Sequence, residues 1–134
     1  MKQCHYQFRV QWGDTDAAGI VYSPNYYKWM DQATHYVFTK IGYPLSKLIR
    51  DEQIGIPMIE SSCHFSMPLY FEEEVTIISS ILELHNKVFK IKHEFIRGED
   101  KIADGFELRA FASFVGEKPK AIYIPEEIRE LLVR

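Results

Sequence analysis

The sequence has few cysteines and lacks the motifs of common metal and nucleotide sites. Its two cysteines, Cys4 and Cys63, form neither a C-x-x-C pair nor a disulfide framework, so free thiols in a reducing cytoplasm fit both. Its five histidines lack the close pairing of H-E-x-x-H or H-x-H, which argues against a metal site. No G-x-S-x-G elbow, G-x-G-x-x-G turn or Walker loop is present, which argues against a serine hydrolase and a nucleotide cofactor.

Long apolar runs and an excess of one charge are also missing. No stretch approaches the roughly 18 apolar residues of a transmembrane helix. The N-terminal sequence M-K-Q-C-H-Y-Q-F-R has no apolar core of a signal peptide. The formal net charge is −3 and no basic stripe accompanies the aromatic residues, which argues against nucleic acid as a partner. We therefore expect a cytoplasmic protein with no membrane span.

The composition is that of an ordinary globular protein. The 134 residues are 46% hydrophobic and 26% charged. We find no internal repeat, low-complexity segment or linker. A chain of this length can bury a sizeable core, so we expect one domain over residues 1–134.

A strand followed by a long helix is predicted near the N-terminus. Apolar and aromatic residues alternate with polar ones from His5 to Trp12, the pattern of a half-buried strand. Ser23 and Pro24 suit the N-cap and first position of a helix, and Gly42 suits its C-terminal cap. Apolar residues recur between them at three- and four-residue spacing, so one face of this helix should be buried.

The rest of the chain predicts mainly antiparallel strands. The expected ranges are 44–53 for a short helix, 58–67, 74–84, 88–97 and 102–115 for four strands, and 125–134 for a last helix. In the fourth strand, Phe106, Leu108 and Ala110 are expected to lie on one apolar face. A strand, a long helix and then consecutive strands predict an α+β domain with one sheet packed on the helix.

An acidic turn, G-D-T-D, lies between the first strand and the long helix and contains Asp14 and Asp16. A helix N-terminus presents unpaired backbone N–H groups and a partial positive charge. Such a site can stabilise a carbonyl oxygen that becomes an oxyanion. A carboxylate in the preceding turn could attack the same carbonyl or activate water. Aspartate is also common in turns, so a purely structural role is the alternative.

Residues 13–26 form the motif G-D-x-D-x-x-G-I-V-Y-x-x-N-Y, which resembles the hotdog-fold acyl-CoA thioesterases of the 4-hydroxybenzoyl-CoA thioesterase type. Weaker similarity covers Gly55–Glu60, Phe71–Ile77 and Pro119–Ile128. The resemblance implies a hotdog fold, in which an antiparallel sheet wraps around one long central helix. It also implies hydrolysis of an acyl-CoA thioester to a free acid and coenzyme A, with no metal or redox cofactor.

The resemblance further implies roles for residues of the acidic turn. Asp16 matches the catalytic carboxylate, acting as nucleophile or as general base, and Asp14 matches a turn stabiliser. The backbone N–H of Ser23 matches the group that faces the thioester oxygen. Pro24 has no N–H, so Asn25 or Tyr26 are the further possible donors.

Three neighbouring residues are expected to shape the pocket. Gly19 would let the loop pack close to the acyl chain, and Tyr22 would line the pocket. Asn25 matches an asparagine of the family; a structural hydrogen bond at the helix start is the alternative role.

A site at a dimer interface is also implied, in a homodimer or a tetramer of dimers. The segment Ile59–Ser62 matches the strand that completes the pocket of the second subunit. Glu60, Ser61 and Ser62 are therefore candidate substrate-binding residues, with the solvent face of a strand as the alternative. Glu60 is also a weaker alternative to Asp16 for positioning water.

Coenzyme A recognition departs from the pattern of the family. The basic run expected after the second sheet strand is replaced by His85, Asn86 and Lys87. Lys87, Lys90 and Lys92 remain as candidate phosphate contacts, with a solvated face as the alternative for the last two. The shortage of cations favours, as an alternative, a thioester carried on acyl carrier protein. A non-catalytic protein that binds acyl thioesters is a further alternative, against which the presence of Asp16 argues.

Overall fold

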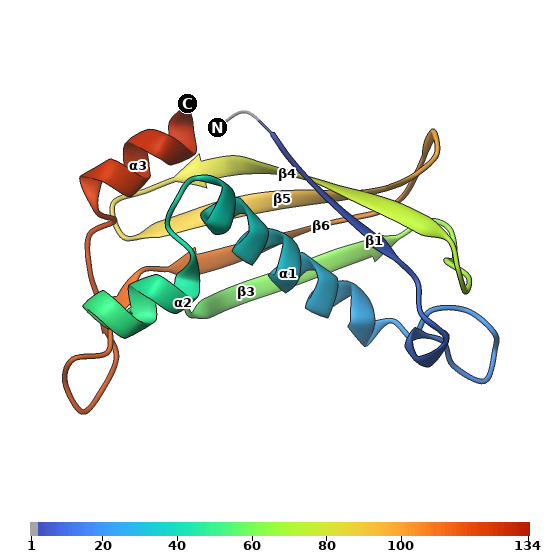
Figure 1. The fold of residues 1–134 in the computed structure, drawn as a ribbon, viewed down its shortest axis with the longest axis horizontal. Helices are drawn as coiled ribbons and strands as arrows, with labels where there is room; N and C mark the ends of the chain where they lie inside the picture. The colour runs from blue at the N-terminus through green and yellow to red at the C-terminus, as the bar shows by residue number, and fades with distance from the viewer. Residues whose placement is uncertain (1–2) are drawn as a thin grey trace.

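The computed structural model describes residues 3–134 (Figure 1). The elements along the chain are β1 (Cys4–Arg9), a 3-10 turn η1 (Trp12–Asp14), α1 (Pro24–Lys40), α2 (Leu45–Lys47), a π-helical turn η2 (Leu48–Glu52), β2 (Ile54–Gly55), β3 (Met58–Phe65), β4 (Glu74–Leu84), β5 (Val88–Arg97), β6 (Asp100–Ala110), β7 (Ala112–Ser113), β8 (Lys120–Ala121) and α3 (Glu126–Val133). The predicted long helix and the strands at 74–84 and 88–97 are confirmed. The strand predicted over 102–115 is divided into β6 and β7.

One antiparallel sheet with the strand order β1-β4-β5-β6-β3 forms the body of the protein. Helix α1 lies across its inner face (Figure 1). A second small sheet, β2-β7-β8, lies outside it. This arrangement confirms the predicted antiparallel sheet around one long helix. Strand β3 is an edge, because within residues 3–134 it pairs with β6 alone.

Helix α1 is held on the sheet by one apolar face. Its buried residues are Tyr26, Trp29, Met30, Ala33, Thr34, Val37 and Phe38. They follow the three- and four-residue spacing that puts side chains on one side of a helix. Opposite them, alternate residues of β5 point inward, with Phe89, Ile91 and Phe95 fully buried. Burial of this apolar area is the main force that fixes the helix on the sheet.

The core contains two apolar clusters. The first surrounds Phe38, Phe89 and Phe111, and the second surrounds Tyr26 and Phe95. Polar residues occupy the positions between them on each element: Thr34 on α1, Ser79 on β4, His93 on β5 and Glu107 on β6. A polar layer therefore separates the two halves of the core.

Phe106, Leu108 and Ala110 share one face of β6, as predicted, and this face is the outer one. These three residues are partly exposed, whereas Glu107 and Arg109 are buried. The register of β6 with β5 explains the difference. Glu107 pairs with Ile91 and Arg109 with Phe89, so both share the inner face with these two residues.

Gly105 allows α1, β3 and β6 to approach one another closely. A Cβ atom at this position would lie 2.3 Å from the carbonyl oxygen of Ser62 on β3 and 2.8 Å from the sulfur of Met30 on α1. Both distances are far below van der Waals contact. The absence of a side chain at Gly105 is therefore a condition of this packing.

Candidate active site

Asp14 fastens the acidic turn to the start of α1. Its Oδ2 accepts the N–H of Gln11 at 2.7 Å. Its carbonyl oxygen accepts the N–H of Tyr22 at 2.9 Å and the Nδ2 of Asn25 at 2.8 Å. Asp14 therefore has the stabilising contacts expected of it, and Asn25 makes the structural hydrogen bond that was its alternative role.

Asp16 lies exposed in the next turn of the loop. Its Oδ1 accepts the N–H of Ala18 at 2.9 Å, and its main chain bonds to Ile20 and Gly19. Gly19 has a φ of +82°, in the left-handed region that favours glycine, so it is needed for the turn itself. Within residues 3–134 the Oδ2 of Asp16 has no hydrogen-bond partner. The carboxylate is thus held by one oxygen and free at the other.

A pocket of about 330 Å³ opens beside the first turn of α1. It is lined by Ile20, Val21, Ser23, Tyr26, Phe65, Ser66, Met67 and Pro68. Asp16, Gly19 and Tyr22 are not among its walls, although the loop that carries them leads into it. Tyr22 is 56% exposed.

Ser23, the residue before α1, has helical dihedral angles and no side-chain capping bond, so its predicted capping hydrogen bond is absent. The N–H groups of Asn25 and Tyr26 donate to the carbonyls of Tyr22 and Ser23. They are therefore not free to supply the further donors that were predicted. The N–H of Ser23 has no partner among the described residues. It is the one predicted donor that remains available beside the pocket.

Tyr26 forms the inner wall of this pocket. Its ring contacts Phe65 with a centroid distance of 4.8 Å and Phe95 with one of 5.4 Å. Burial raises the pKa of Tyr26 to about 12, so its hydroxyl is neutral at physiological pH. Phe65 is the last residue of edge strand β3 and lines the pocket, so the end of this strand lies at the pocket.

Glu60, Ser61 and Ser62 are not brought to this pocket within one chain. Strand β3 begins near α2 and ends near the start of α1 (Figure 1). Pairing of Glu60 with Leu108 and of Ser62 with Phe106 puts both on the outer face of the sheet. Ser61 pairs with Glu107 and is on the inner face.

The candidate phosphate contacts also lie on the outer face or near it. Lys90 and Lys92 flank a depression of about 370 Å³ that Ser62 also lines. Each already has a carboxylate at 3.7 Å, from Glu83 and Glu94 respectively. Outside this depression, the Nζ of Lys87 lies 5.1 Å from the centre of the ring of Tyr123. Ser62, Lys90 and Lys92 therefore line the same depression on the outer face. Neither Ser62 nor any of the three lysines lines the pocket at α1.

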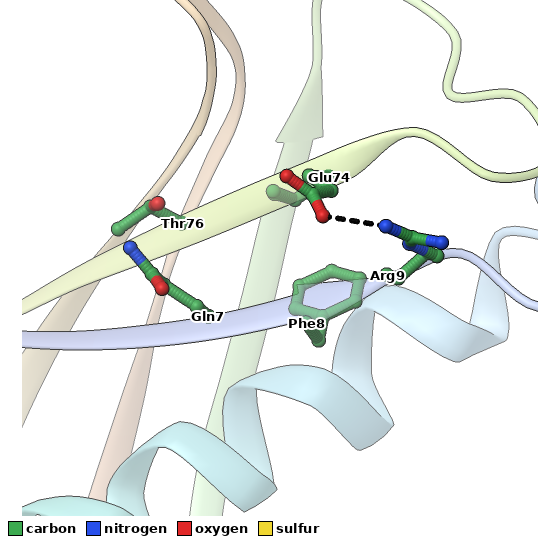
Figure 2. A pocket seen from close by; sticks show the side chains of 6 residues that line it. Gln7, Phe8, Arg9, Glu74 and Thr76 are labelled. Atoms are coloured by element: carbon green, nitrogen blue, oxygen red, sulfur yellow. Dashed lines mark hydrogen bonds and ion pairs between the residues drawn. The ribbon is translucent and has the colours of Figure 1, made fainter.

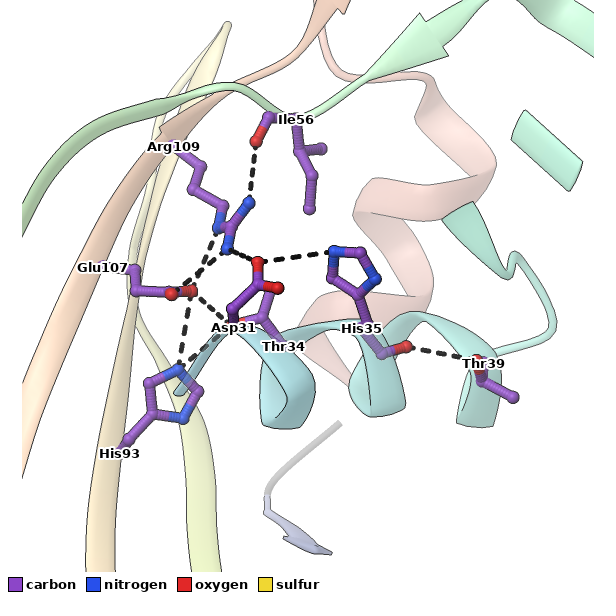
Figure 3. Close-up of polar contacts among 8 residues, drawn as sticks. All are labelled: Asp31, Thr34, His35, Thr39, Ile56, His93, Glu107 and Arg109. Atoms are coloured by element: carbon purple, nitrogen blue, oxygen red, sulfur yellow. Dashed lines mark hydrogen bonds and ion pairs between the residues drawn. The ribbon is translucent and has the colours of Figure 1, made fainter. Parts of the chain in front are cut away.

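A buried polar network under the middle of α1 was not predicted (Figure 3). His93 lies between Ser79, 2.7 Å from its Nδ1, and Thr34, 3.0 Å from its Nε2. The hydroxyl of Thr34 donates to Glu107 at 2.5 Å. Because this uses its one hydrogen, Thr34 accepts from Nε2, so the ring carries a hydrogen on that nitrogen. An inward histidine among Phe89, Ile91 and Phe95 was the signal that could have revealed the network.

Arg109 completes the network from the neighbouring position on β6. Its Nε and Nη2 donate to Glu107 at 3.0 and 3.1 Å, its Nη2 to Asp31 at 2.6 Å, and its Nη1 to the carbonyl of Ile56 at 3.0 Å. Burial alone would raise the pKa of Glu107. Hydrogen bonds from Arg109 and Thr34, the charge of Arg109 and the ring of His93, whose Nε2 lies 3.7 Å from Oε1, instead lower that pKa to about 2, so Glu107 is ionised.

The opposite edge of the sheet presents a very different ion pair. Arg9 on β1 donates to Glu74 on β4 at 2.8 Å, beside Gln7, Phe8 and Thr76 (Figure 2). Both side chains are exposed, and the pair has no link to the pocket at α1.

In the described part of the chain there is no group of three metal-binding side chains. No helix in residues 3–134 is both long and apolar enough to cross a membrane.

Comparison with known proteins identifies the family. Residues 10–132 match the model of the thioesterase-like superfamily. The 4-hydroxybenzoyl-CoA thioesterase of Pseudomonas sp. strain CBS-3 is 33% identical over 132 residues, covering 93% of this chain and 94% of that protein. The structure of a gentisyl-coenzyme A thioesterase is 45% identical with a TM-score of 0.86, covering 98% of this chain and all of the other.

A second solved structure shows a ligand complex of the same fold. An Asp-to-Asn variant of a 4-hydroxybenzoyl-CoA thioesterase, complexed with 4-hydroxybenzoyl-CoA, is 29% identical, with a TM-score of 0.92 and coverage of 98% and 99%. These matches confirm the hotdog fold and the resemblance found in the acidic turn. The chain belongs to the thioesterase-like superfamily.

Proposed function

We propose that this protein is an acyl-CoA thioesterase that hydrolyses a thioester to a free acid and coenzyme A. The observation that carries the proposal is the pairing of a half-free carboxylate, Asp16, with a free N–H at Ser23, on one loop beside an apolar pocket. Relatives named for 4-hydroxybenzoyl-CoA and gentisyl-CoA support thioester hydrolysis. They make these two esters the first substrates to test.

The chemistry follows from the positive end of α1. The thioester oxygen would accept the N–H of Ser23, and the helix dipole would stabilise the negative charge that develops on it. The free Oδ2 of Asp16 could attack the carbonyl carbon, which expels coenzyme A and leaves an anhydride for water to open. Alternatively it could take a proton from a water molecule that attacks the same carbon. Both routes give the same products.

A second copy of the chain would complete the site. Edge strand β3 has unpaired backbone groups on one side and exposes Met58, Ile59 and Phe65. Antiparallel pairing of two β3 strands about a two-fold axis would satisfy these groups. It would place Met58 of the partner subunit beside Phe65, so that the segment Glu60–Ser62 approaches the pocket of the other chain. We propose a homodimer on this basis, with a tetramer of dimers as the larger assembly.

Two further assignments belong to the same proposal. Lys87, Lys90 and Lys92 are the cations available for the phosphates of coenzyme A, approached from the outer face of the sheet. Cys4 and Cys63 are both free thiols, which supports a cytoplasmic location.

Thiol release from a panel of acyl-CoA esters tests the activity. The panel contains 4-hydroxybenzoyl-CoA, gentisyl-CoA and short and medium acyl esters, with wild type beside Asp16→Asn. We expect the substitution to lower kcat by about a hundredfold or more, the range for loss of a general base. Asp14→Asn is the matched control, because it removes a carboxylate charge from the same turn and should cost far less. Equal rates for wild type and Asp16→Asn would move the chemistry to another residue.

The carrier alternative needs one more comparison. The same acyl group is offered on coenzyme A and on acyl carrier protein, and the two values of kcat/KM are compared. Faster turnover of the carrier-bound group would replace coenzyme A with the carrier in the proposal. Binding of either thioester without thiol release would favour the non-catalytic role.

A further inference from the structure

Arg109 is a buried charge whose donor groups all point to fixed partners. The residue is 5% exposed, and its Nε, Nη1 and Nη2 all make hydrogen bonds to Glu107, Ile56 or Asp31. A buried ion pair is no more stable, in general, than apolar residues of the same size. The pair of Arg109 with Glu107 is therefore better explained by the geometry it imposes than by the stability it adds.

That geometry concerns the start of β3. The carbonyl of Ile56, which accepts from Arg109, lies two residues before this strand. The next carbonyl, of Pro57, accepts the N–H of Ala110 at 3.1 Å. A register shift follows between Met58 and Glu60, so regular pairing with β6 does not by itself set where these first residues lie. The guanidinium also bonds to Asp31 on α1, and so fixes the entry of β3 relative to the helix.

The start of β3 lies far from the pocket of its own chain. Ser23 and Tyr26 line that pocket at the beginning of α1. Arg109 instead lies beyond the polar layer, at the end of β6 nearest α2 (Figures 1 and 3). In a two-fold dimer with paired β3 strands, the start of one β3 meets the end of the other at Phe65. The residues that Arg109 fixes would then face the pocket of the second subunit.

We propose that Arg109, held by Glu107, is a positioning residue for the active site of the partner subunit. It sets the segment Met58–Ser62 against the pocket of the other chain, beside the loop that carries Asp16. This inference rests on the proposed thioesterase function and on the two-fold dimer. In this proposal, the buried ion pair of one chain aligns the substrate that is bound in the other chain.

Mixed dimers distinguish this role from an effect within one chain. Two differently tagged chains are co-expressed, and the dimers that carry both tags are purified. In the first dimer one chain carries Asp16→Asn and the other carries Arg109→Lys, which keeps the charge but loses the planar fork. In the second dimer both substitutions are on one chain, and the other chain is wild type.

The proposal predicts opposite results for the two dimers. We expect the Arg109→Lys homodimer to lose about a hundredfold in kcat/KM, the cost of a misplaced substrate. The first dimer should recover about half of wild-type activity, because one site pairs an intact Asp16 with a strand fixed by an intact Arg109. The second dimer should be inactive. An active second dimer and an inactive first would show that Arg109 acts within its own chain, and would overturn the proposal. So would an unimpaired Arg109→Lys homodimer.

A structural readout separates failure of this proposal from failure of the proposed function. Amide hydrogen exchange over residues 56–62 should speed up in Arg109→Lys and stay unchanged in Arg9→Lys, its matched control at the opposite edge. If wild type hydrolyses no thioester, the proposed function fails. Independently of that result, unchanged amide exchange over residues 56–62 in Arg109→Lys would show that Arg109 does not hold this segment, and would overturn the proposal. The double variant Glu107→Gln/Arg109→Met removes both buried charges. It should fold and dimerise, yet show the same pattern in mixed dimers.

Discussion

The acidic turn before α1 and the polar network beneath it both contain carboxylates, yet they are built in opposite ways. Asp16 is exposed and keeps one oxygen without a partner. Glu107 is fully buried and accepts hydrogen bonds from Thr34 and from Arg109. A carboxylate that is to react needs a free oxygen, whereas one that holds structure needs all of its oxygens satisfied. Four predictions test this contrast, from the largest expected effect to the smallest.

Arg109→Ala should cause the largest loss of stability. It would leave the carboxylate of Glu107 buried and without its cation, which costs about 3–5 kcal/mol in free energy of unfolding. The matched control is Arg9→Ala, because Arg9 and Glu74 form an exposed pair, whose loss costs about 1 kcal/mol or less. Denaturant unfolding at one fixed protein concentration measures both. Similar losses for the two variants would show that the network contributes no more than a surface ion pair.

Acid should weaken the network that contains Glu107. The pKa of Glu107 falls from 4.5 to about 2 on folding, so its contribution is fully present above pH 4.5 and is lost as pH falls from there towards 2. The shift corresponds to about 3 kcal/mol. Stability measured between pH 5 and pH 2, a range set by this shift, should decline more steeply in wild type than in Glu107→Gln. Parallel curves would contradict the assignment.

Asn25→Ala should have an intermediate effect. It removes the hydrogen bond from Nδ2 to the carbonyl of Asp14, a loss of about 1 kcal/mol. Because this bond holds the turn against α1, kcat/KM should also fall. Asn25→Asp should cost at least as much stability, since a carboxylate cannot donate to a carbonyl. A stable and fully active Asn25→Asp would show that the turn needs no such tether.

Asp16→Asn should have the smallest effect on stability. Asparagine keeps the Oδ1 that accepts the N–H of Ala18, so the free energy of unfolding should change by no more than about 0.5 kcal/mol. The loss of turnover expected for the same variant then reports on chemistry alone. A destabilisation of several kcal/mol would mean that Asp16 belongs with the structural carboxylates after all.

The sequence predicted the elements whose pattern is local. Helix α1 and strands β4 and β5 have clear periodicity, and the turn motif pointed to Asp16 and Ser23 before any geometry was known. Apart from the pair Glu107 and Arg109, which are two residues apart, the polar network depends on partners 14 to 78 residues apart along the chain, which no local pattern contains. On β6 the alternation predicted that Phe106 and Leu108 share one face, but not which face of the strand is buried. The structure puts Glu107 and Arg109 on the inner face, where each finds a hydrogen-bond partner.

Gly105 has a consequence for how freely the sequence can vary. A Cβ at this position would collide with the backbone of Ser62 as well as with Met30, and a backbone carbonyl in a paired strand cannot turn aside. In a library with all twenty amino acids at this codon, selection for folded protein should return glycine alone. The outward neighbours Asp104 and Phe106, which are only partly buried, should accept many replacements. The least tolerant position of the strand is therefore the one with no side chain at all.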